Sequence, residues 1–425
     1  PPRWKKIIKA KMKEFKVNEH LTLEDALNTE DISHLLKEID AIEVKSLNLS
    51  RKLKNMKIPK WITRFKSLRH LDLSKNNLES LPEFITELPS LESLNLQGNN
   101  LNELPESLGR LKDLKILIVA NNMNMMLSKN ERKSKIFQLP ESLKNLDSLE
   151  VLNLSHCNLK KLPESIGELK SLRVFNLSKN MGLSSLPESI GKLTSLETLD
   201  LNKCNLSFLP ESLGMLKSLE ILDLGGNKDL NTLPESIGKL SSLKKFVLDW
   251  ERIDHFPKMM KNLDCIKHIS LWRRKKPVPE SISNLTSLEV LTIAGKKIGS
   301  LPESLVKLTK LKKLNLNGRM HQWKERNLKT LPKVIGKLKS LEILSLEWNG
   351  INNLYEFIGN LRNLKELNLS HNHLDKLPES IGKLLSLEKL ELNENNLITL
   401  PKSIGELDQL EELSLRSNRI KRLPD

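Results

Sequence analysis

The chain has 425 residues, enough for two or three ordinary globular domains, and carries a net charge of +16. Glycine and proline are too few for a collagen-like or disordered chain, and no apolar run approaches the roughly 20 residues that a membrane-spanning helix needs. The three cysteines are too few and too scattered for a disulfide framework or a paired metal site.

Residues 1–43 come before any repeat and show helical patterning. Apolar residues recur at helical spacing from Leu23 to Ile39, with Thr22 in the N-cap position. The preceding segment, Arg3 to Lys16, carries seven positive charges against one negative and has the same apolar spacing. We expect residues 1–43 to form a helical N-terminal cap. The alternative for the basic segment is binding to an anionic surface.

From Val44 onward the sequence repeats with a period of 23 residues, LxxLxLxxNxLxxLPxxIGxLxx. The match spans residues 44–425 and gives sixteen repeats, of which the last is cut short. They begin at Val44, Leu68, Leu91, Leu114, Leu149, Leu172, Leu196, Leu219, Leu243, Ile266, Leu288, Leu311, Leu341, Leu364, Leu387 and Leu410.

The spacing within one repeat predicts its local structure. The LxL step alternates inward apolar and outward polar side chains, which indicates a short strand, and identical strands in successive repeats pair in parallel. Proline and glutamate in the LPES segment suit the start of a short helix or 3₁₀ turn. A recurring asparagine follows each strand, where a buried amide can bond the backbone of its own and the neighbouring repeat: Asn76, Asn99, Asn122, Asn180, Asn227, Asn349, Asn372, Asn395 and Asn418.

These patterns predict an α/β solenoid with a parallel sheet on the concave face and short helical or 3₁₀ segments on the convex face. The repeat resembles bacterial leucine-rich-repeat proteins such as those of Leptospira, as well as animal Ras-pathway scaffolds and plant intracellular Ras-group proteins. Cys157 and Cys204 stand in the asparagine position, as in plant disease-resistance receptors. The bacterial resemblance implies a secreted or cell-surface host-interaction protein, with a cytoplasmic location as the alternative. These families share a scaffold and differ in partners.

No catalytic signature occurs: Walker-type, GxGxxG, HExxH, GxSxG and CxxC motifs are all missing from the sequence. His371 and His373 flank a repeat asparagine and favour polar surface over a metal pair. Cys157 and Cys204 are expected to be buried small hydrophobes and not nucleophiles. We therefore predict a non-catalytic, monomeric binding scaffold without cofactor or metal.

Repeats nine to twelve depart from the consensus together. Residues 251–339 hold +14 of the net charge of +16. In these four repeats a charged residue replaces the recurring asparagine. A charged side chain loses its solvation when it is buried, so we expect this edge of the solenoid to open toward water. The substituted positions are Glu251, Arg274, Lys296 and Arg319.

Exposed tryptophan beside arginine is the composition of an interaction hot spot, so we predict a mixed aromatic and basic binding patch over repeats nine to thirteen. The opposing interpretation is that the tryptophans fill a degenerate stretch of the solenoid and the lysines solvate it. The expected ligand is another protein, with a sulfated glycan as the alternative and no nucleic acid. The candidate residues are Asp249, Trp250, His268, Trp272, Arg273, Arg274, Trp323, Glu347 and Trp348.

A second concave feature is an apolar stripe, in which the strand residue before the inward leucine is apolar. Ile116 belongs to it and Ile118 extends it. The stripe is either a contact for a protein ligand or simple filling by residues with β-propensity. A further alternative for the whole chain is the recognition domain of a larger effector or immune receptor.

Overall fold

The computed structural model describes residues 44–53, 57–122, 137–249, 262–273, 278–295, 300–318 and 328–424. The helical cap expected over residues 1–43 therefore lies outside the described residues. The chain divides into two compact units, which we treat one at a time. Unit 1 is Pro1–Leu230 with Pro234–Leu240, and unit 2 is Asn231–Leu233 with Ser241–Asp425.

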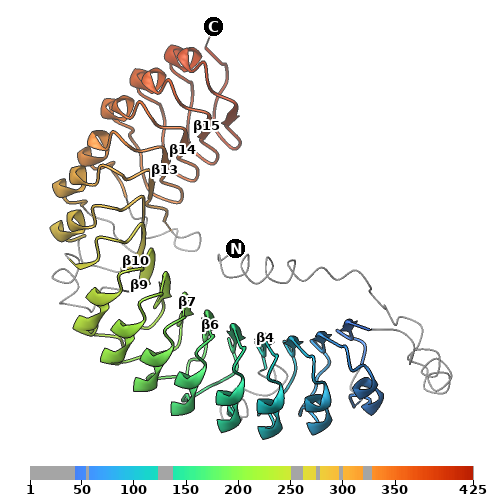
Figure 1. Cartoon of the computed structure of the whole chain (residues 1–425). Helices are drawn as coiled ribbons and strands as arrows, with labels where there is room; N and C mark the ends of the chain where they lie inside the picture. The colour runs from blue at the N-terminus through green and yellow to red at the C-terminus, as the bar shows by residue number, and fades with distance from the viewer. Residues whose placement is uncertain are drawn as a thin grey trace. The chain divides into compact units, whose positions relative to one another are not determined.

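Unit 1 alternates short strands with 3₁₀ helices, and within the unit the strands lie on one side and the helices on the other (Figure 1). Its strands are β1 (Ser46–Asn48), β2 (His70–Asp72), β3 (Ser93–Asn95), β4 (Ile116–Ile118), β5 (Val151–Asn153), β6 (Val174–Asn176), β7 (Thr198–Asp200) and β8 (Ile221–Asp223). Its helices are η1 (Lys60–Arg64), η2 (Glu83–Glu87), η3 (Glu106–Arg110), η4 (Glu141–Asn145), η5 (Glu164–Glu168), η6 (Glu188–Lys192), η7 (Glu211–Met215) and η8 (Glu235–Lys239).

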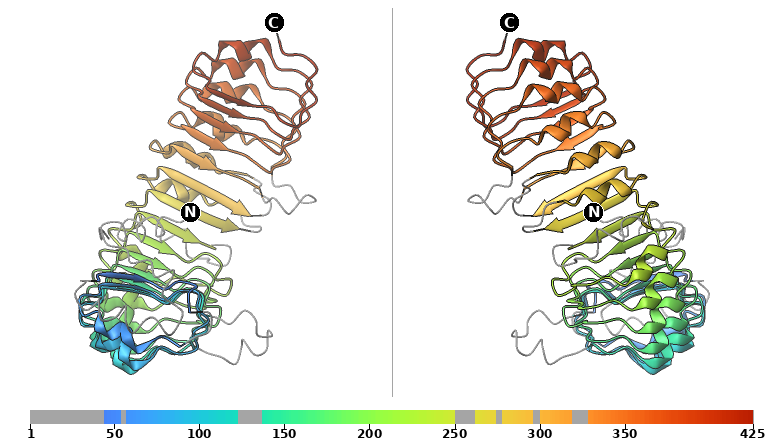
Figure 2. Two further views of the ribbon diagram at one scale, coloured as in Figure 1. Left: turned by 90° about the vertical axis from the view of Figure 1, so that its right-hand side faces the viewer. Right: turned by 90° about the vertical axis from the view of Figure 1, so that its left-hand side faces the viewer.

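Unit 2 repeats the same alternation, but two of its strands are longer, and Figure 2 shows both as long arrows. Its strands are β9 (Lys245–Leu248), β10 (His268–Arg273), β11 (Val290–Gly295), β12 (Lys313–Asn315), β13 (Ile343–Ser345), β14 (Glu366–Asn368), β15 (Lys389–Glu391) and β16 (Glu412–Ser414). Its described helices are η11 (Glu280–Asn284), η12 (Glu303–Lys307), η13 (Lys333–Lys337), η14 (Glu356–Asn360), η15 (Glu379–Lys383) and η16 (Lys402–Glu406).

Within each unit every strand pairs in parallel with the strands of the neighbouring repeats, and the central inward residues stay in register. Leu94 aligns with Leu71 on one side and with Leu117 on the other. These inward residues are buried, and Phe175 and Phe246 are the bulkiest of them. The predicted solenoid with a parallel sheet and short 3₁₀ segments is confirmed.

The repeat asparagines form the predicted ladder. The Oδ1 atom of Asn99 accepts the N–H groups of Asn76 and Leu78 at 2.9 and 3.1 Å. Its Nδ2 atom donates to the carbonyls of Leu96 and Leu73 at 2.9 and 3.0 Å. One buried amide thus satisfies four backbone groups in two repeats, which a polar group with a single partner could not do.

The two cysteines in ladder positions reproduce part of this pattern. The thiol of Cys157 donates to the carbonyl of Val119 at 3.3 Å, and that of Cys204 to the carbonyl of Leu177 at 3.1 Å. Burial raises the pKa of both thiols to about 12. They are therefore buried structural thiols, as their position in the repeat predicts.

Each described 3₁₀ helix has five residues, and it begins one residue later than the sequence suggests. Proline was expected at the first helical position, but Pro163 is extended, with φ −71° and ψ 152°, and precedes η5. Its carbonyl accepts the first bond of the turn, from the N–H of Ile166 at 3.1 Å. Glutamate, not proline, therefore opens the helix.

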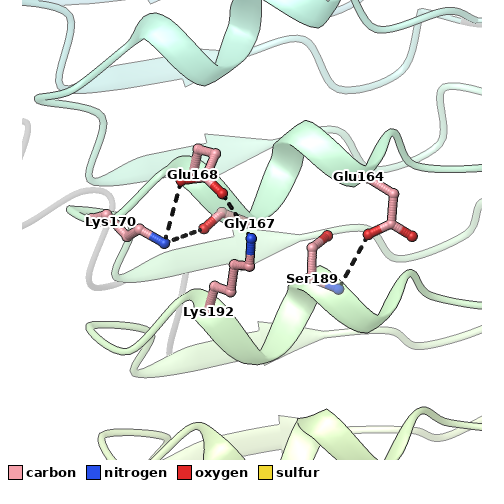
Figure 3. A network of polar contacts seen from close by, with 6 residues as sticks. All are labelled: Glu164, Gly167, Glu168, Lys170, Ser189 and Lys192. Atoms are coloured by element: carbon pink, nitrogen blue, oxygen red, sulfur yellow. Dashed lines mark hydrogen bonds and ion pairs between the residues drawn. The ribbon is translucent and has the colours of Figure 1, made fainter.

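In many of the described repeats, the glutamate that opens the helix bonds to the next repeat. Figure 3 shows the carboxylate of Glu164 accepting the N–H of Ser189 at 3.3 Å. Other LPES segments make the same contact, for example Glu188 with Ser212 at 3.2 Å. A carboxylate at a helix N-terminus satisfies donors that have no partner inside the helix. These glutamates therefore link successive helices, in addition to the expected effect on their own.

A second set of ionic contacts crosses between the same helices. In Figure 3, Glu168 at the end of η5 pairs with Lys192 of η6 at 3.0 Å and with Lys170 at 3.6 Å. Lys170 also donates to the carbonyl of Gly167 at 2.9 Å. Because all three charged side chains are more than two-fifths exposed, these pairs add little stability.

Glycine in the LPESIGKL segment allows the helices to approach one another. A Cβ atom added to Gly167 would lie 2.3 Å from the carbonyl oxygen of Ser189 in the next helix. Gly191 and Gly214 face the equivalent serines at similar distances. The row of Gly–Ser contacts thus sets the spacing of the repeats on the helix side.

Candidate functional site

Three features of the strand side can make contact with a partner. We call the outward-pointing side chains of the strands the strand face. We call the residues between each strand and its ladder position the turn edge. The first two features lie on the strand face, and the third lies on the turn edge of unit 2.

The strand face of unit 1 carries a buried apolar cluster. Ile116 and Ile118 belong to it and are 1% and 6% exposed. The remaining members are Ala120, Val151 and Val174. The two isoleucines of the predicted stripe therefore belong to one cluster that extends over β4, β5 and β6. Little of their side-chain surface is accessible to solvent in this structure.

The strand face of unit 2 begins with a basic area. His268 of β10 aligns with Lys245 of β9 on one side and with Val290 of β11 on the other, and Val290 aligns with Lys313 of β12. The residues just before these strands form a parallel row: Lys244, Lys267, Glu289 and Lys312.

One carboxylate stands among these cations. Glu289 pairs with Lys267 at 3.1 Å. The hydrogen bond from Lys267 is the main cause that holds the pKa of Glu289 below its usual value, and the charges of His268 and Lys312 act in the same direction. Lys312 pairs with Glu342 of the next repeat at 3.2 Å. The area is still positive overall, because its other lysines outnumber these carboxylates.

Farther along unit 2 the strand face carries both signs. Lys365 pairs with Glu388 at 3.2 Å, and Lys389 pairs with Glu412 at 2.9 Å. These ion pairs link neighbouring repeats, and this part of the strand face is neither predominantly positive nor predominantly negative. The positive area is thus confined to β9–β12 within the described part of unit 2.

The turn edge of unit 2 holds a stacked aromatic pair. The indole of Trp348 lies parallel to the imidazole of His371, with ring centroids 3.7 Å apart and an angle of 9° between the planes. Both side chains are partly exposed. The pair presents a flat, amphipathic surface at the end of β13 and β14.

The backbone at Trp348 is left-handed, with φ +59°. His371 and Glu394 occupy the same step of the next two repeats and have φ of +57° and +55°. The turn closely approaches the preceding repeat, because a Cβ atom at Gly318 would lie 1.7 Å from the carbonyl oxygen of Trp348. The same step is left-handed in most of the described repeats, for example at Lys75 and His156, so this conformation is a feature of the repeat and not a strain specific to Trp348.

Glu347 precedes this turn and is partly buried. Its N–H donates to Oδ1 of Asn317 at 2.9 Å, and its carbonyl accepts the N–H of Gly318 at 2.8 Å. The preceding repeat therefore holds the backbone of Glu347, directly before Trp348. The sequence predicted Glu347 and Trp348 as candidates but missed the partner His371, which it assigned to polar surface.

The structure describes some of the predicted binding residues fully, some by their backbone alone, and some not at all. Asp249 and His268 are partly buried at the strand face and its end. The backbones of Trp272 and Arg273 belong to β10 and pair with Ala294 and Gly295 of β11. Trp250, Arg274 and Trp323 lie outside the described residues, as do the charged ladder substitutions at 251, 274, 296 and 319.

Among the described residues, no group of three or more His, Cys, Asp or Glu could hold a metal ion. In the same part of the chain no helix has the length and apolar character needed to cross a bilayer. His371 contacts Trp348, and His373 is exposed.

The fold and this arrangement define a leucine-rich-repeat protein. The leucine-rich repeat region family matches residues 130–208, 267–353 and 347–425. Two further leucine-rich-repeat families match residues 42–101 with 66–123, and residues 218–240. These matches cover more than half of the sequence, and the chain belongs to the leucine-rich-repeat family, whose domains are generally non-catalytic binding scaffolds.

Among solved structures, the chain is similar to a leucine-rich-repeat protein of Leptospira interrogans. The two share 30% identity over 92% of this chain and 94% of that one, with a TM-score of 0.65. The predicted resemblance to Leptospira-type proteins is confirmed. Comparison with curated proteins gives no match.

Two receptors share the architecture. One is the ectodomain of the Arabidopsis thaliana receptor kinase GASSHO1/SCHENGEN3, solved in complex with CASPARIAN STRIP INTEGRITY FACTOR 2. It shows 26% identity and a TM-score of 0.52, with 89% of this chain and 50% of that chain covered. The other is Drosophila Toll in the Toll–Spatzle complex, with 22% identity, a TM-score of 0.59, and 87% and 56% covered. At 22% identity, the similarity to Toll shows a shared fold and nothing more.

Proposed function

We propose that this chain binds another protein through the strand face and turn edge of unit 2, with Trp348 as an anchor. The observation that carries the proposal is the Trp348–His371 stack. A large aromatic side chain stands partly exposed on the turn edge and stacks on the residue at the same step of the next repeat. Exposed tryptophan is enriched in binding hot spots.

The similarity to receptors supports the same class of function. The Arabidopsis ectodomain was solved in complex with CASPARIAN STRIP INTEGRITY FACTOR 2, and its likeness to this chain extends over 89% of the sequence. The likeness to the Leptospira interrogans protein favours a bacterial, secreted or surface-exposed molecule, whose ligand would then be a host protein. Trp250 and Trp272 extend the proposed site toward repeats nine and ten.

The test uses the full chain, immobilised and exposed to a panel of purified serum and extracellular-matrix proteins. For the ligand that binds, Trp348→Ala should weaken Kd at least tenfold, about 1.4 kcal/mol. Met181→Ala is the matched control, because Met181 is 68% exposed in unit 1. If Trp348→Ala binds like the parent chain, the anchor is wrong. If a Trp250→Ala/Trp272→Ala variant also binds normally, the whole site is wrong.

A second candidate, binding of a sulfated glycan, is favoured by the basic area of β9–β12. Lys245 and His268 are aligned there by strand pairing, and Lys313 occupies the same row beyond Val290. Polyanion binding of this kind weakens steeply with salt. The chain should elute late from a heparin column in a salt gradient, and a variant with Arg273, Arg274, Lys275 and Lys276 all changed to Glu should elute early. Early elution of both would exclude this candidate.

A further inference from the structure

The strand face of unit 1 is buried where an open sheet should be exposed. On β4, β5, β6 and β7 both outward positions of each strand are less than 9% exposed. In the first outward row, Ile116, Val151 and Val174 are 1%, 0% and 2% exposed. In the second row, Asn176 and Asp200 are 1% and 7% exposed.

Outward positions on several other strands are more exposed, although Ser93 on β3 and Val247 on β9 are each 7% exposed. Ile221 on β8 aligns with Thr198 on β7 and is partly exposed, as are Val290 and Ile343 in unit 2. These residues are β-branched, like Ile116, Val151 and Val174. Neighbouring strands about 4.8 Å away border an outward side chain but do not cover it from above. The difference in burial therefore indicates an occupant over β4–β7.

The described elements do not provide that occupant. Strands contact the strands beside them, and 3₁₀ helices contact the helices beside them. None of these described elements lies across the strand face of unit 1. The occupant must come from another part of the chain or from another molecule.

The chemistry of the covered area specifies the occupant. Its centre is apolar, and its border carries the carboxylates of Glu150, Asp200 and Asp223. Lys115 and Arg173 also lie there, and each pairs with a glutamate of the adjacent repeat. A buried carboxylate such as that of Asp200 is stable when positive charge lies near it. An occupant with one apolar face and basic flanks fits this area.

An unsatisfied amide adds a second requirement. Asn176 accepts hydrogen bonds from the N–H and hydroxyl groups of Ser178 at 2.9 and 2.8 Å. Its Nδ2 group is buried and has no acceptor among the residues that the structure describes. A buried donor without an acceptor is costly, so an occupant that offers an oxygen atom here gains binding energy.

We propose that the occupant is the chain's own N-terminal segment, Arg3 to Lys16. This segment carries seven positive charges and one negative charge, and Trp4, Ile7 and Ile8 begin its apolar face. As a helix of 14 residues it is about 21 Å long, and three steps between four strands span about 14 Å. The apolar face packs on the cluster, and the lysines lie next to the bordering carboxylates.

The connection is long enough. Residues 17–43 lead from this segment to Val44, just before β1. Even if all of them were helical, they would extend about 40 Å, whereas β1 and β5 are four strand steps, about 19 Å, apart. Residues 22–43 can therefore cap the first repeat while Arg3–Lys16 occupies the strand face. This inference concerns unit 1 and does not depend on the function proposed for unit 2.

The experiment is limited trypsin digestion of the full chain, followed by mass spectrometry. Trypsin cuts after Lys and Arg, so a docked basic segment is protected. The Val151→Lys/Val174→Lys variant places positive charge in the covered area at outward positions, next to but not within the inward core at Leu152 and Phe175. Cleavage within Arg3–Lys16 should accelerate at least tenfold, whereas the matched control Val290→Lys/Ile343→Lys should match the parent chain.

Three results would overturn the proposal. In the first, cleavage within Arg3–Lys16 is equally fast in all three proteins. In the second, the double variant exposes Lys129–Lys135 instead, which would make the segment after β4 the occupant. In the third, protection depends on protein concentration, which would make a second copy the occupant.

A second measurement covers the case in which the double variant does not fold. Val174→Cys, made in a Cys265→Ser background, places a thiol in the covered area while Cys157 and Cys204 stay buried. Deletion of residues 1–16 should raise the rate of reaction of this thiol with an aromatic disulfide reagent at least tenfold. An unchanged rate, with the melting temperature also unchanged, contradicts docking of this segment.

Discussion

At the scale of single residues, the ladder asparagines are the most heavily bonded side chains of the described solenoid. Asn180 accepts the N–H groups of Cys157 and Leu159, both at 3.0 Å. It donates to the carbonyls of Leu154 and Leu177. No ordered solvent is needed to satisfy these groups, because one amide has both donors and an acceptor in the required geometry.

Asn180→Ala should therefore be strongly destabilising. It leaves buried backbone donors and acceptors without partners, and we expect a loss of about 2–4 kcal/mol in the free energy of unfolding. Urea denaturation followed by circular dichroism measures the change. Asn145→Ala, at an exposed position of η4, is the control and should alter stability by less than about 0.5 kcal/mol. Equal effects of the two substitutions would refute the ladder's energetic role.

The thiols of Cys157 and Cys204 should resist alkylation at pH 8. Their pKa of about 12 leaves almost no thiolate at that pH, and burial excludes the reagent. Cys265 is only partly buried and should react first. Mass spectrometry of peptides after a short exposure to iodoacetamide measures this order. Modification of Cys157 ahead of Cys265 would contradict it.

At the scale of elements, close approach between helices depends on glycine. Gly167→Ala should destabilise the chain by about 1–3 kcal/mol, because the new Cβ atom would collide with the backbone of Ser189. Gly405→Ala is the matched control. It occupies the same place in η16, where no atom lies within 4 Å, and should be neutral or slightly stabilising. Thermal unfolding of both variants compares them, and similar melting temperatures would refute the steric explanation.

Glu106, which opens η3, makes stability depend on pH. Burial opposes ionisation of Glu106, but the N–H groups of Ser142 and Glu141 outweigh it and hold its pKa below the usual value. A lowered pKa in the folded state adds stability above the ordinary value of 4.5, and this contribution is lost as the pH falls through the lowered pKa.

Glu106→Gln should therefore lower the melting temperature at pH 7 and make little difference near pH 2. The control is Glu103→Gln, at an exposed position three residues earlier. Differential scanning calorimetry across this pH range measures both variants. A deficit of Glu106→Gln that stays constant with pH would show that the carboxylate charge does not contribute.

At the scale of the whole molecule, contacts within each unit are local, since β6 pairs only with β5 and β7. The stability of such a solenoid is approximately the sum of the stabilities of its repeats and of the interfaces between neighbouring repeats. Phe175→Ala should cost about 3–5 kcal/mol. The increase in amide hydrogen exchange should be concentrated in β5–β7 and absent from β13–β15. Phe246→Ala should move the increase to β9 and β10. A uniform increase in exchange along the chain would mean that it unfolds as one cooperative body.

The charge of the molecule is also distributed by region. Nearly all of its net charge lies in residues 251–339. Strand pairing aligns His268 of that stretch with Lys245 of β9 just before it, and Lys313 of β12 lies two strands farther on, beyond Val290 of β11. Sequence spacing alone could predict this clustering, because parallel strands in constant register bring equivalent residues of successive repeats together. The repeat period therefore converts a linear charge pattern into a surface.

The candidate site was predictable to a smaller degree. Glu347 and Trp348 stood out as departures from the repeat, but the contact between Trp348 and His371 did not. Those two residues are one repeat apart, and ring stacking depends on turn geometry and side-chain rotamers that residue types do not specify. His371 could have been found by asking which residue occupies the same step of the next repeat.

The sequence by itself determined the repeat, the parallel strands, the ladder and the inward core, because each repeat must bury its leucines against identical neighbours. It also placed Cys157 and Cys204 in buried positions. Only the tertiary structure decided that Ile116 and Ile118 are covered while Ile221 is not, since the two states have the same local sequence pattern. It likewise decided that the LPES glutamates bond to the following helix. Burial of an outward face and bonds between repeats depend on what packs there, and a pattern within one repeat contains no information about that.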